Sequence, residues 1–230
     1  MRIECLNLSY QYPSSSINVF QGLSCRISGP GFHALFGPSG VGKTTLAKMI
    51  AGLVKGYSGT IHVKLKNGIL YTYNLERLPG WSAVGEHLRQ INPSARSNHI
   101  QNLTESFGIA ECLNSRFNRL SLGQQNRVNL TRYLLQDFDL LIMDESLANV
   151  DEATRETIIL KIKEVFSSKA FLYISHNVLE VAKFCKDILV LRDMRKTPQV
   201  IAIRGQDHTR DHTPDRRALE RTMLEIVHAS

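Results

Sequence analysis

A glycine-rich stretch carries the clearest chemistry in this 230-residue sequence. Residues 37–44 read Gly-Pro-Ser-Gly-Val-Gly-Lys-Thr, which fits the phosphate-binding pattern G-x-x-x-x-G-K-[ST]. Glycines let backbone N–H groups converge on a phosphate, while the lysine reaches the terminal phosphates and the threonine hydroxyl binds Mg²⁺. We therefore predict a phosphate site formed by Gly37, Pro38, Ser39, Gly40, Val41, Gly42, Lys43, Thr44 and Thr45.

An acidic pair supplies the second chemical feature. Asp144 and Glu145 follow the apolar run at 140–143, and such a run is typical of a buried strand. A carboxylate at the end of a strand is suited to hold the water shell of a metal ion. A second one beside it is suited to orient or deprotonate an attacking water. Acidic residues also end strands without any catalytic role, so the pair alone leaves both interpretations open.

The elements around the glycine-rich stretch have the order that a phosphate-binding loop requires. Residues 32–36 form a short apolar run, which predicts a strand leading into the loop. After the loop, apolar residues follow the i, i+3, i+4, i+7 spacing of a helix: Leu46, Met49, Ile50 and Leu53. The positive end of that helix dipole would point at the phosphate.

The flanking segments predict strands and a helical insert. Residues 1–30 alternate in polarity around a turn-like PSSS sequence, which predicts an antiparallel pair of strands. Residues 56–75 are also predicted to form strand. Residues 86–135 show a mostly helical pattern, with a break at 92–98.

The second half of the chain predicts a parallel α/β sheet. Apolar runs at 140–143, 170–174 and 188–191 alternate with helical patterns, as parallel strands do. A polar linker at 204–217 and a terminal helix at 218–228 follow. The Asp-His pairs in that linker have the spacing of metal ligands, but a solvated linker is favoured because no apolar periodicity surrounds them.

Composition limits the class of protein and of partner. Lys and Arg number 28 against 21 Asp and Glu, which gives a net charge of +7, and 43% of the residues are hydrophobic. These values are typical of a globular domain and exclude a disordered or collagen-like chain. The positive charge permits a nucleotide, an anionic membrane surface or a nucleic acid as partner.

Cysteine usage and hydropathy indicate the compartment. The 4 cysteines are scattered without a C-x-x-C spacing, which predicts neither a zinc site nor a disulfide framework. No apolar run approaches the roughly 18 residues of a membrane-spanning helix, and the first residues lack the apolar core of a signal peptide. We therefore expect a reducing compartment, with no membrane crossing and no export.

Two further motifs make the sequence resemble a known family. Residues 120–128 read LSLGQQNRV, in which Ser121, Gly123 and Gln124 match the usual signature L-S-G-G-Q of ATP-binding cassette (ABC) proteins. His176, preceded by serine, follows the predicted strand at the place of that family's switch histidine. Together with the phosphate loop and the acidic pair, these motifs make the chain resemble the ATPase subunit of an ABC transporter.

The resemblance implies a fold and a domain organisation. The fold would be a P-loop NTPase of ABC type, an α/β class with a mixed sheet core and an antiparallel β subdomain. A helical subdomain, roughly residues 79–135, would carry the signature. Residues 1–230 would form a single ABC ATPase domain.

The resemblance also assigns site residues for ATP and Mg²⁺. Tyr12 would stack on adenine, with Tyr10 as the competing residue. The catalytic set would be Glu145, His176 and Lys43, and the metal would be held by Thr44, Asn74 and Asp144.

A dimer is the further implication. Ser121, Gly123 and Gln124 would open a helix facing the ATP bound by an opposite subunit. Asp151 would act across the same interface. The partner would be a second copy of the chain, giving a homodimer, or a different cassette, giving a heterodimer.

The sequence departs from the family pattern at three positions. Asn74 stands where the family has a glutamine that contacts the metal and the permease. Leu122 replaces the first signature glycine, and Ser146 replaces the usual proline after Glu145. The groups that perform the chemistry are all present, so we still expect ATP hydrolysis with Mg²⁺.

Residues 75–88 resemble the ATPases of nitrate, sulfonate and taurine importers. In the family a membrane permease docks here, which makes Glu76, Arg77 and Trp81 the expected contacts. Packing of Trp81 inside the helical insert is the alternative. The resemblance thus implies permease subunits, a solute-binding protein acting through them, and a peripheral location on the cytoplasmic side of the cell (inner) membrane.

Two other functions stay open at this point. The first is a soluble cassette protein that acts on nucleic acid or the ribosome, as the positive charge would allow. The chain has one cassette and no heptad run, so we do not expect nucleic acid as the partner. The second is a nucleotide-binding regulatory cassette without hydrolysis, motivated by Asn74 and Leu122.

Overall fold

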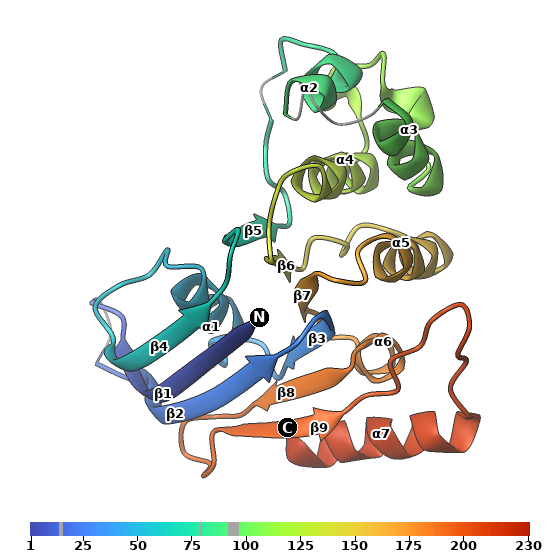
Figure 1. Cartoon of the computed structure of the whole chain (residues 1–230). Helices are drawn as coiled ribbons and strands as arrows, with labels where there is room; N and C mark the ends of the chain where they lie inside the picture. The colour runs from blue at the N-terminus through green and yellow to red at the C-terminus, as the bar shows by residue number, and fades with distance from the viewer. Residues whose placement is uncertain (14–15, 79, 92–96) are drawn as a thin grey trace.

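Two sheets form the framework of the protein. The computed structural model describes residues 1–13, 16–78, 80–91 and 97–230, and Figure 1 shows their arrangement. The smaller sheet is antiparallel, with the order β2-β1-β4, formed by Asn18–Ser28, Arg2–Gln11 and Ser58–Lys64. The predicted antiparallel pair at the start of the chain is confirmed.

The larger sheet carries the site. Its order is β5-β6-β7-β3-β8-β9, formed by Ile69–Tyr73, Leu140–Asp144, Ala170–Ile174, Gly31–Phe36, Asp187–Leu191 and Val200–Arg204. The first five of these strands run parallel, which confirms the parallel sheet predicted from the runs at 140–143, 170–174 and 188–191, and β9 pairs antiparallel with β8. The sheet is therefore mixed, and the carboxyl ends of β3, β6 and β7 share one edge.

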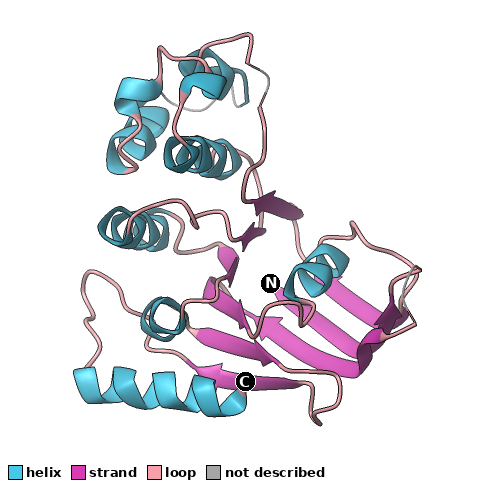
Figure 2. Ribbon diagram, turned by 180° about the vertical axis from the view of Figure 1, so that it is seen from behind, coloured by secondary structure: helices cyan, strands magenta, loops and turns pink. Residues whose placement is uncertain are grey.

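Helices cover the larger sheet and form a separate layer above it. They are α1 Lys43–Ile50, α2 Val84–Ile91, α3 Ser97–Ser106, α4 Leu122–Leu134, α5 Glu152–Val165, α6 Val178–Phe184 and α7 Arg216–Ala229. Two short 3₁₀ turns, Ala110–Cys112 and Phe117–Arg119, precede α4. Figure 2 shows α2, α3 and α4 grouped at one end of the molecule, above α5. All three lie within the stretch predicted to be the helical subdomain. Most of the predicted break at 92–98 lies outside the described residues.

The strand pattern explains why the central strands are buried on both faces. Every residue of β6 is buried. Leu140 and Ile142 pack with α1 and the antiparallel sheet, whereas Leu141 and Met143 pack with α4, α5 and α6. A strand between two apolar layers needs a continuous apolar run, and 140–143 supplies it.

The helix after the phosphate loop is shorter than its apolar spacing predicted. It ends at Ile50, and Gly52 follows in the left-handed region at φ 74°. Leu53 lies beyond this turn and is 62% exposed, so its place on the helix was wrong. Glycine tolerates this backbone conformation, which turns the chain out of the helix.

The segment at 204–217 differs from the predicted solvated linker. Its first residue ends β9, a strand that was not predicted. His208 is buried, and Lys163 Nζ donates to Asp207 Oδ1 and to the His208 carbonyl, each at 2.6 Å. The buried amine of Lys163 thus holds the polar segment against α5 through these hydrogen bonds. Within the described ranges no His, Cys, Asp and Glu cluster has the makeup of a metal site.

The terminal helix begins slightly earlier than predicted. Asp215 caps α7 by accepting from the Ala218 N–H at 3.0 Å, so the helix includes Arg216 and Arg217. In the described part of the chain, no helix combines the length and the apolar character needed to cross a membrane.

Candidate nucleotide-binding site

The phosphate loop is shaped by close contacts that exclude larger residues. It connects the end of β3 to α1, and Gly42 at the helix N-cap has φ 105°. A Cβ atom at Gly42 would lie 2.6 Å from Val19 Cγ1 and 2.8 Å from Phe20 Cε1. Glycine is therefore required by packing as well as by backbone conformation. The predicted order of strand, loop and helix is confirmed.

Lys43 is already turned toward its own loop. Its Nζ atom donates to the carbonyl oxygens of Gly37 and Pro38, both at 2.8 Å. Burial lowers the pKa of Lys43, and the negative charges of Glu145 and Asp144 oppose that shift. The amine thus lies over the loop and close to both acidic side chains of the predicted site.

Asp144 has a partner that sequence reasoning missed. The Tyr71 hydroxyl donates to Asp144 Oδ2 at 2.6 Å. Burial, followed by this hydrogen bond, raises the pKa of Tyr71, so the hydroxyl stays a donor. Alternation along β5 places Tyr71 and Tyr73 on one face, and pairing of β5 with β6 brings that face to Asp144. The alternation along β5 can be read from the sequence, but its pairing with β6 cannot, so the sequence alone does not reveal this hydrogen bond.

Several predicted metal and catalytic residues line one cavity. A cavity of about 680 Å³ is bordered by Thr44, Lys48, Leu53, Val54, Tyr71, Tyr73, Asn74, Asp144 and Glu145. It brings together a hydroxyl, an amide and two carboxylates from three separate segments. These oxygen-rich side chains are the ligand types that Mg²⁺ prefers.

The side-chain oxygen of Asn74 is engaged elsewhere. Asn74 Oδ1 accepts from Asn126 Nδ2 at 3.0 Å and from Asn149 Nδ2 at 2.8 Å. Asn126 belongs to α4, and Asn149 lies on the loop after β6. An amide oxygen has two lone pairs, and both are used here. Direct metal binding through this atom would require the loss of at least one of these bonds.

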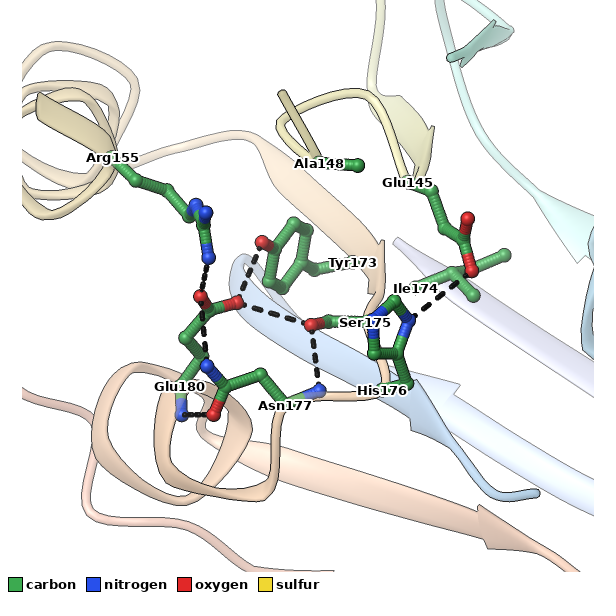
Figure 3. Close-up of a pocket in the computed structure, with 9 residues that line it drawn as sticks. All are labelled: Glu145, Ala148, Arg155, Tyr173, Ile174, Ser175, His176, Asn177 and Glu180. Atoms are coloured by element: carbon green, nitrogen blue, oxygen red, sulfur yellow. Dashed lines mark hydrogen bonds and ion pairs between the residues drawn. The ribbon is translucent and has the colours of Figure 1, made fainter. Parts of the chain in front are cut away.

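Glu145 and His176 face each other across the end of the sheet. His176 Nδ1 lies 3.4 Å from Glu145 Oε1, and Figure 3 shows the pair beside a cavity of about 300 Å³. Glu145 has φ 51°, a left-handed conformation that costs energy for a residue with a Cβ atom. Such strain concentrates at functional sites, and here it turns the carboxylate toward His176.

The signature residues have local structural roles. Ser121 caps α4 by accepting from the Gln124 N–H at 3.3 Å, and Gln124 Oε1 accepts from the Ser121 N–H at 2.9 Å. A Cβ atom at Gly123 would lie 2.5 Å from the Asn149 carbonyl oxygen, whereas Leu122 is exposed. The prediction that these residues open a helix is confirmed. Both ribbon views place α4 well apart from α1.

Tyr12, rather than Tyr10, lies beside the phosphate loop. The Tyr12 hydroxyl forms a hydrogen bond with Thr45 Oγ1. Its exposed ring borders a cavity of about 230 Å³ with Val41 of the loop, while Tyr10 packs against the core beneath the antiparallel sheet. An exposed ring next to the loop is suited to stack on a base.

The expected permease contacts separate into exposed and internal residues. The Glu76 carboxylate accepts from Arg132 and from the Tyr133 hydroxyl, and its side chain is only 12% exposed. Glu76 is thus engaged by α4 of its own chain, and its contact with a permease stays a prediction. Arg77 is exposed, and Trp81 is 79% exposed, which rules out packing of Trp81 in the helical layer.

Asp151 has a structural role that sequence reasoning did not state. It caps α5, where its Oδ1 accepts from the Thr154 N–H at 2.9 Å. This hydrogen bond lowers the pKa of the Asp151 carboxyl. Its action across a dimer interface stays a prediction.

The curated relatives are ATP-binding proteins of import systems. Molybdenum import ATP-binding protein ModC from Saccharophagus degradans is 33% identical over 71% of this chain and 50% of that protein. The chain thus spans about half the length of the ModC proteins it matches. Taurine import ATP-binding protein TauB from Ruegeria pomeroyi is 29% identical over 83% of this chain and 77% of that protein.

A solved structure and a family model complete the comparison. A bacterial Atm1-family ABC exporter with ATP bound has a TM-score of 0.73 at 20% identity, covering 83% of this chain and 37% of that one. This likeness confirms the predicted fold. The family model described as ABC transporter matches residues 20–148, which is more than half of the chain. The chain belongs to the ABC transporter family.

Proposed function

We propose that the chain is the ATP-binding and ATP-hydrolysing subunit of an ABC importer. The observation that carries this proposal is the single cavity onto which Thr44, Asp144 and Glu145 converge. The charge of Lys43 interacts with those of the same carboxylates, and His176 Nδ1 is 3.4 Å from Glu145 Oε1. Phosphoryl transfer to water needs this combination of charge neutralisation and positioning.

ATP and Mg²⁺ fit the residues that are present. The backbone N–H groups of the loop and the start of α1 would hold the phosphates, with the amine of Lys43 at their terminal end. The Thr44 hydroxyl and the Asp144 carboxylate border one cavity and would hold Mg²⁺. When bound, Mg²⁺ supplies neutralisation of the phosphate charge. Tyr12 would hold the adenine ring.

Glu145 and His176 would orient the attacking water. The Glu145 carboxylate would accept the proton of that water as a general base. His176, on the neighbouring loop, would hold the γ-phosphate and the water in line. The strained backbone of Glu145 supports this role, because it fixes where the carboxylate points.

A head-to-tail dimer would complete the site. α4 lies apart from α1 in the same chain, so Ser121, Gly123 and Gln124 would reach the ATP of a second cassette. The N-terminus of α4 would add its free N–H groups to that γ-phosphate. Asp151, on the loop before α5, would face the partner.

Permease subunits would be the membrane partners. Arg77 and Trp81 are exposed on the segment before α2 and would contact the permease, with a solute-binding protein delivering cargo to it. The import systems named for the curated relatives support this direction of transport. The chain would then lie peripherally on the cytoplasmic side of the cell (inner) membrane.

Substitution of the general base tests the proposal. We expect Glu145→Gln to lower the kcat for ATP hydrolysis by at least about 100-fold, because general bases contribute factors of 10² to 10⁴. The variant should retain ATP and elute as a dimer in size-exclusion chromatography. Glu225→Gln, an exposed carboxylate change on α7, serves as the control and should leave turnover unchanged. Normal turnover of the Glu145→Gln variant would refute the assignment of the base.

A regulatory cassette without hydrolysis is the second candidate. It is favoured by the engaged oxygen of Asn74, which removes one expected metal ligand. A single-turnover measurement with ATP in the presence of excess chain separates the two functions. Conversion of the bound ATP to ADP supports the hydrolysing subunit, and its persistence supports the regulatory one.

A further inference from the structure

Glu180 forms a buried polar centre next to the proposed catalytic pair. Its side chain lies on α6 and is 6% exposed. Oε1 accepts from Arg155 Nη1 and from Asn177 Nδ2, the latter at 3.2 Å. Oε2 accepts from the hydroxyls of Tyr173 and Ser175, both at 3.0 Å (Figure 3). A carboxylate with both oxygens engaged in this way is held in one orientation.

The centre holds the backbone on both sides of His176. Ser175 Oγ donates to Glu180 and accepts from the Asn177 N–H at 3.1 Å. Asn177 Oδ1 in turn accepts from the Glu180 N–H at 3.2 Å. The His176 side chain is 75% exposed, so packing contributes little to its direction. The direction of the imidazole is therefore set by a loop that Glu180 fixes.

Arg155 links this centre to the loop that carries Glu145. Arg155 lies on α5, and its Nη2 atom donates to the Val150 carbonyl oxygen. Val150 ends the segment that runs from Glu145 to the cap of α5. The loops after β6 and after β7 are thus joined through one ion pair. These are the two loops that present the general base and the switch histidine.

We propose that Glu180, with Arg155, is a positioning residue for ATP hydrolysis. Together they hold the loop after β7, which carries His176, in a fixed position relative to the loop after β6, which carries Glu145. This inference rests on the proposed function, since it requires that His176 acts in hydrolysis. In this proposal Glu180 does not itself act on the nucleotide or the attacking water. Its effect passes through Ser175 and Asn177 to the imidazole.

Two variants of the purified full chain test this role. Ser175→Ala removes the hydrogen bond that Ser175 donates to Glu180 and the one it accepts from the Asn177 N–H, while the Arg155–Glu180 ion pair stays in place. Glu180→Gln removes the charge, and it leaves Arg155 without its anionic partner, so it also threatens stability. We expect each variant to lower kcat by at least about tenfold with little change in the KM for ATP, because loss of alignment affects the chemical step more than binding.

The matched control joins the same two helices. Glu156, the residue after Arg155 on α5, accepts from Lys183 at 2.8 Å, and Lys183 lies about one turn after Glu180 on α6. Glu156→Gln removes that ion pair without touching the His176 loop. We expect its kcat to equal that of the wild type. A kcat loss in the control as large as that in Ser175→Ala would show a general effect of the α5–α6 contact and overturn the proposal.

A double-mutant cycle separates positioning from stability. In a His176→Ala background, Ser175→Ala should lower kcat no further, because its effect acts through the imidazole. Independent, multiplying losses would overturn the proposal, as would a Ser175→Ala variant with wild-type kcat. If His176→Ala alone leaves kcat unchanged, the role of His176 in the proposed function fails first. Thermal unfolding of each variant checks that every kcat is measured on a folded protein.

Discussion

At the scale of single residues, Tyr71 makes this site different from the one that the motifs describe. The family pattern predicts that the side-chain amide of residue 74 binds the metal. The Asn74 side-chain oxygen instead accepts hydrogen bonds from Asn126 and Asn149. Tyr71 reaches the Asp144 carboxylate instead, at 2.6 Å. An aromatic hydroxyl of the neighbouring strand therefore helps to orient the Asp144 carboxylate.

Removing that hydroxyl should weaken the proposed metal site. For Tyr71→Phe we expect the Mg²⁺ concentration needed for half-maximal ATPase activity to rise about tenfold, since loss of a group that orients a metal ligand typically costs 10- to 100-fold in affinity. Titration of Mn²⁺ followed by electron paramagnetic resonance should show the same shift without turnover.

The adjacent tyrosine gives a control for this change. Tyr73 stacks on Tyr71 with ring centroids 6.1 Å apart and is exposed. Tyr73→Phe should leave the Mg²⁺ dependence unchanged. An unaltered Mg²⁺ dependence of Tyr71→Phe would show that the hydroxyl does not orient Asp144 for the metal.

At the scale of elements, the N-terminus of α4 combines helix capping with proposed phosphate binding. Ser121 and Gln124 form a capping box, so both residues are explained by the helix alone. Substitution by alanine would therefore remove the cap and the phosphate contact together. A residue that caps well but carries a negative charge separates the two roles.

Aspartate at position 121, in the Ser121→Asp variant, meets both conditions. Aspartate caps helices about as well as serine, so we expect the free energy of unfolding to change by less than about 0.5 kcal/mol. Its charge would repel the γ-phosphate of the partner, so ATP-dependent dimerisation, measured by light scattering, should be lost. A Ser121→Asp chain that still dimerises with ATP would contradict the proposed dimer.

The elements differ in how well the sequence predicts them, and burial explains the difference. The run at 140–143 predicts β6 because a strand buried on both faces must be apolar throughout. β9 is a short, partly exposed strand at the edge of the sheet, and its brief apolar run is followed at once by the polar segment. His208 is buried by contacts with α5 and its own segment, which no local pattern records.

The residues of the candidate site also differ in how well the sequence predicts them. Gly42, Lys43 and Thr44 lie within one short motif, so their joint role follows from spacing alone. The hydrogen bond from Tyr71 to Asp144 and those to Asn74 join residues that are far apart in the chain. They depend on which strands pair and on where α4 packs. Glu180 was missed for that reason too, because its partners come from β7, α5 and the loop between β7 and α6.

At the scale of the whole molecule, each proposed ATP site would be shared between two chains. The phosphate loop and the signature lie at separate places in the fold (Figures 1 and 2). One chain would therefore contribute half of each site in a symmetric dimer. Defects in the two halves should then complement each other.

Mixing two inactive variants tests this arrangement. Lys43→Ala disables the phosphate loop, and Ser121→Asp disables the signature, so neither homodimer should hydrolyse ATP. An equal mixture should recover hydrolysis, to at most about half of wild-type activity, because each mixed dimer has one intact site of two. A mixture of Lys43→Ala with Glu145→Gln is the control, since both changes damage the same half. No recovery in the first mixture would contradict a shared site in a homodimer.

The two amides that meet at Asn74 have a mechanical consequence. One comes from α4 and the other from the loop after β6, so a single oxygen is the common acceptor for the helical layer and the sheet. If the helical layer turns as a rigid body against the sheet, at least one of these bonds must lengthen or break. Each such bond contributes about 1 kcal/mol. Asn74 thus couples the helical layer to the loop after β6 through a pair of neutral hydrogen bonds, beside the charged contact of Glu76 with Arg132.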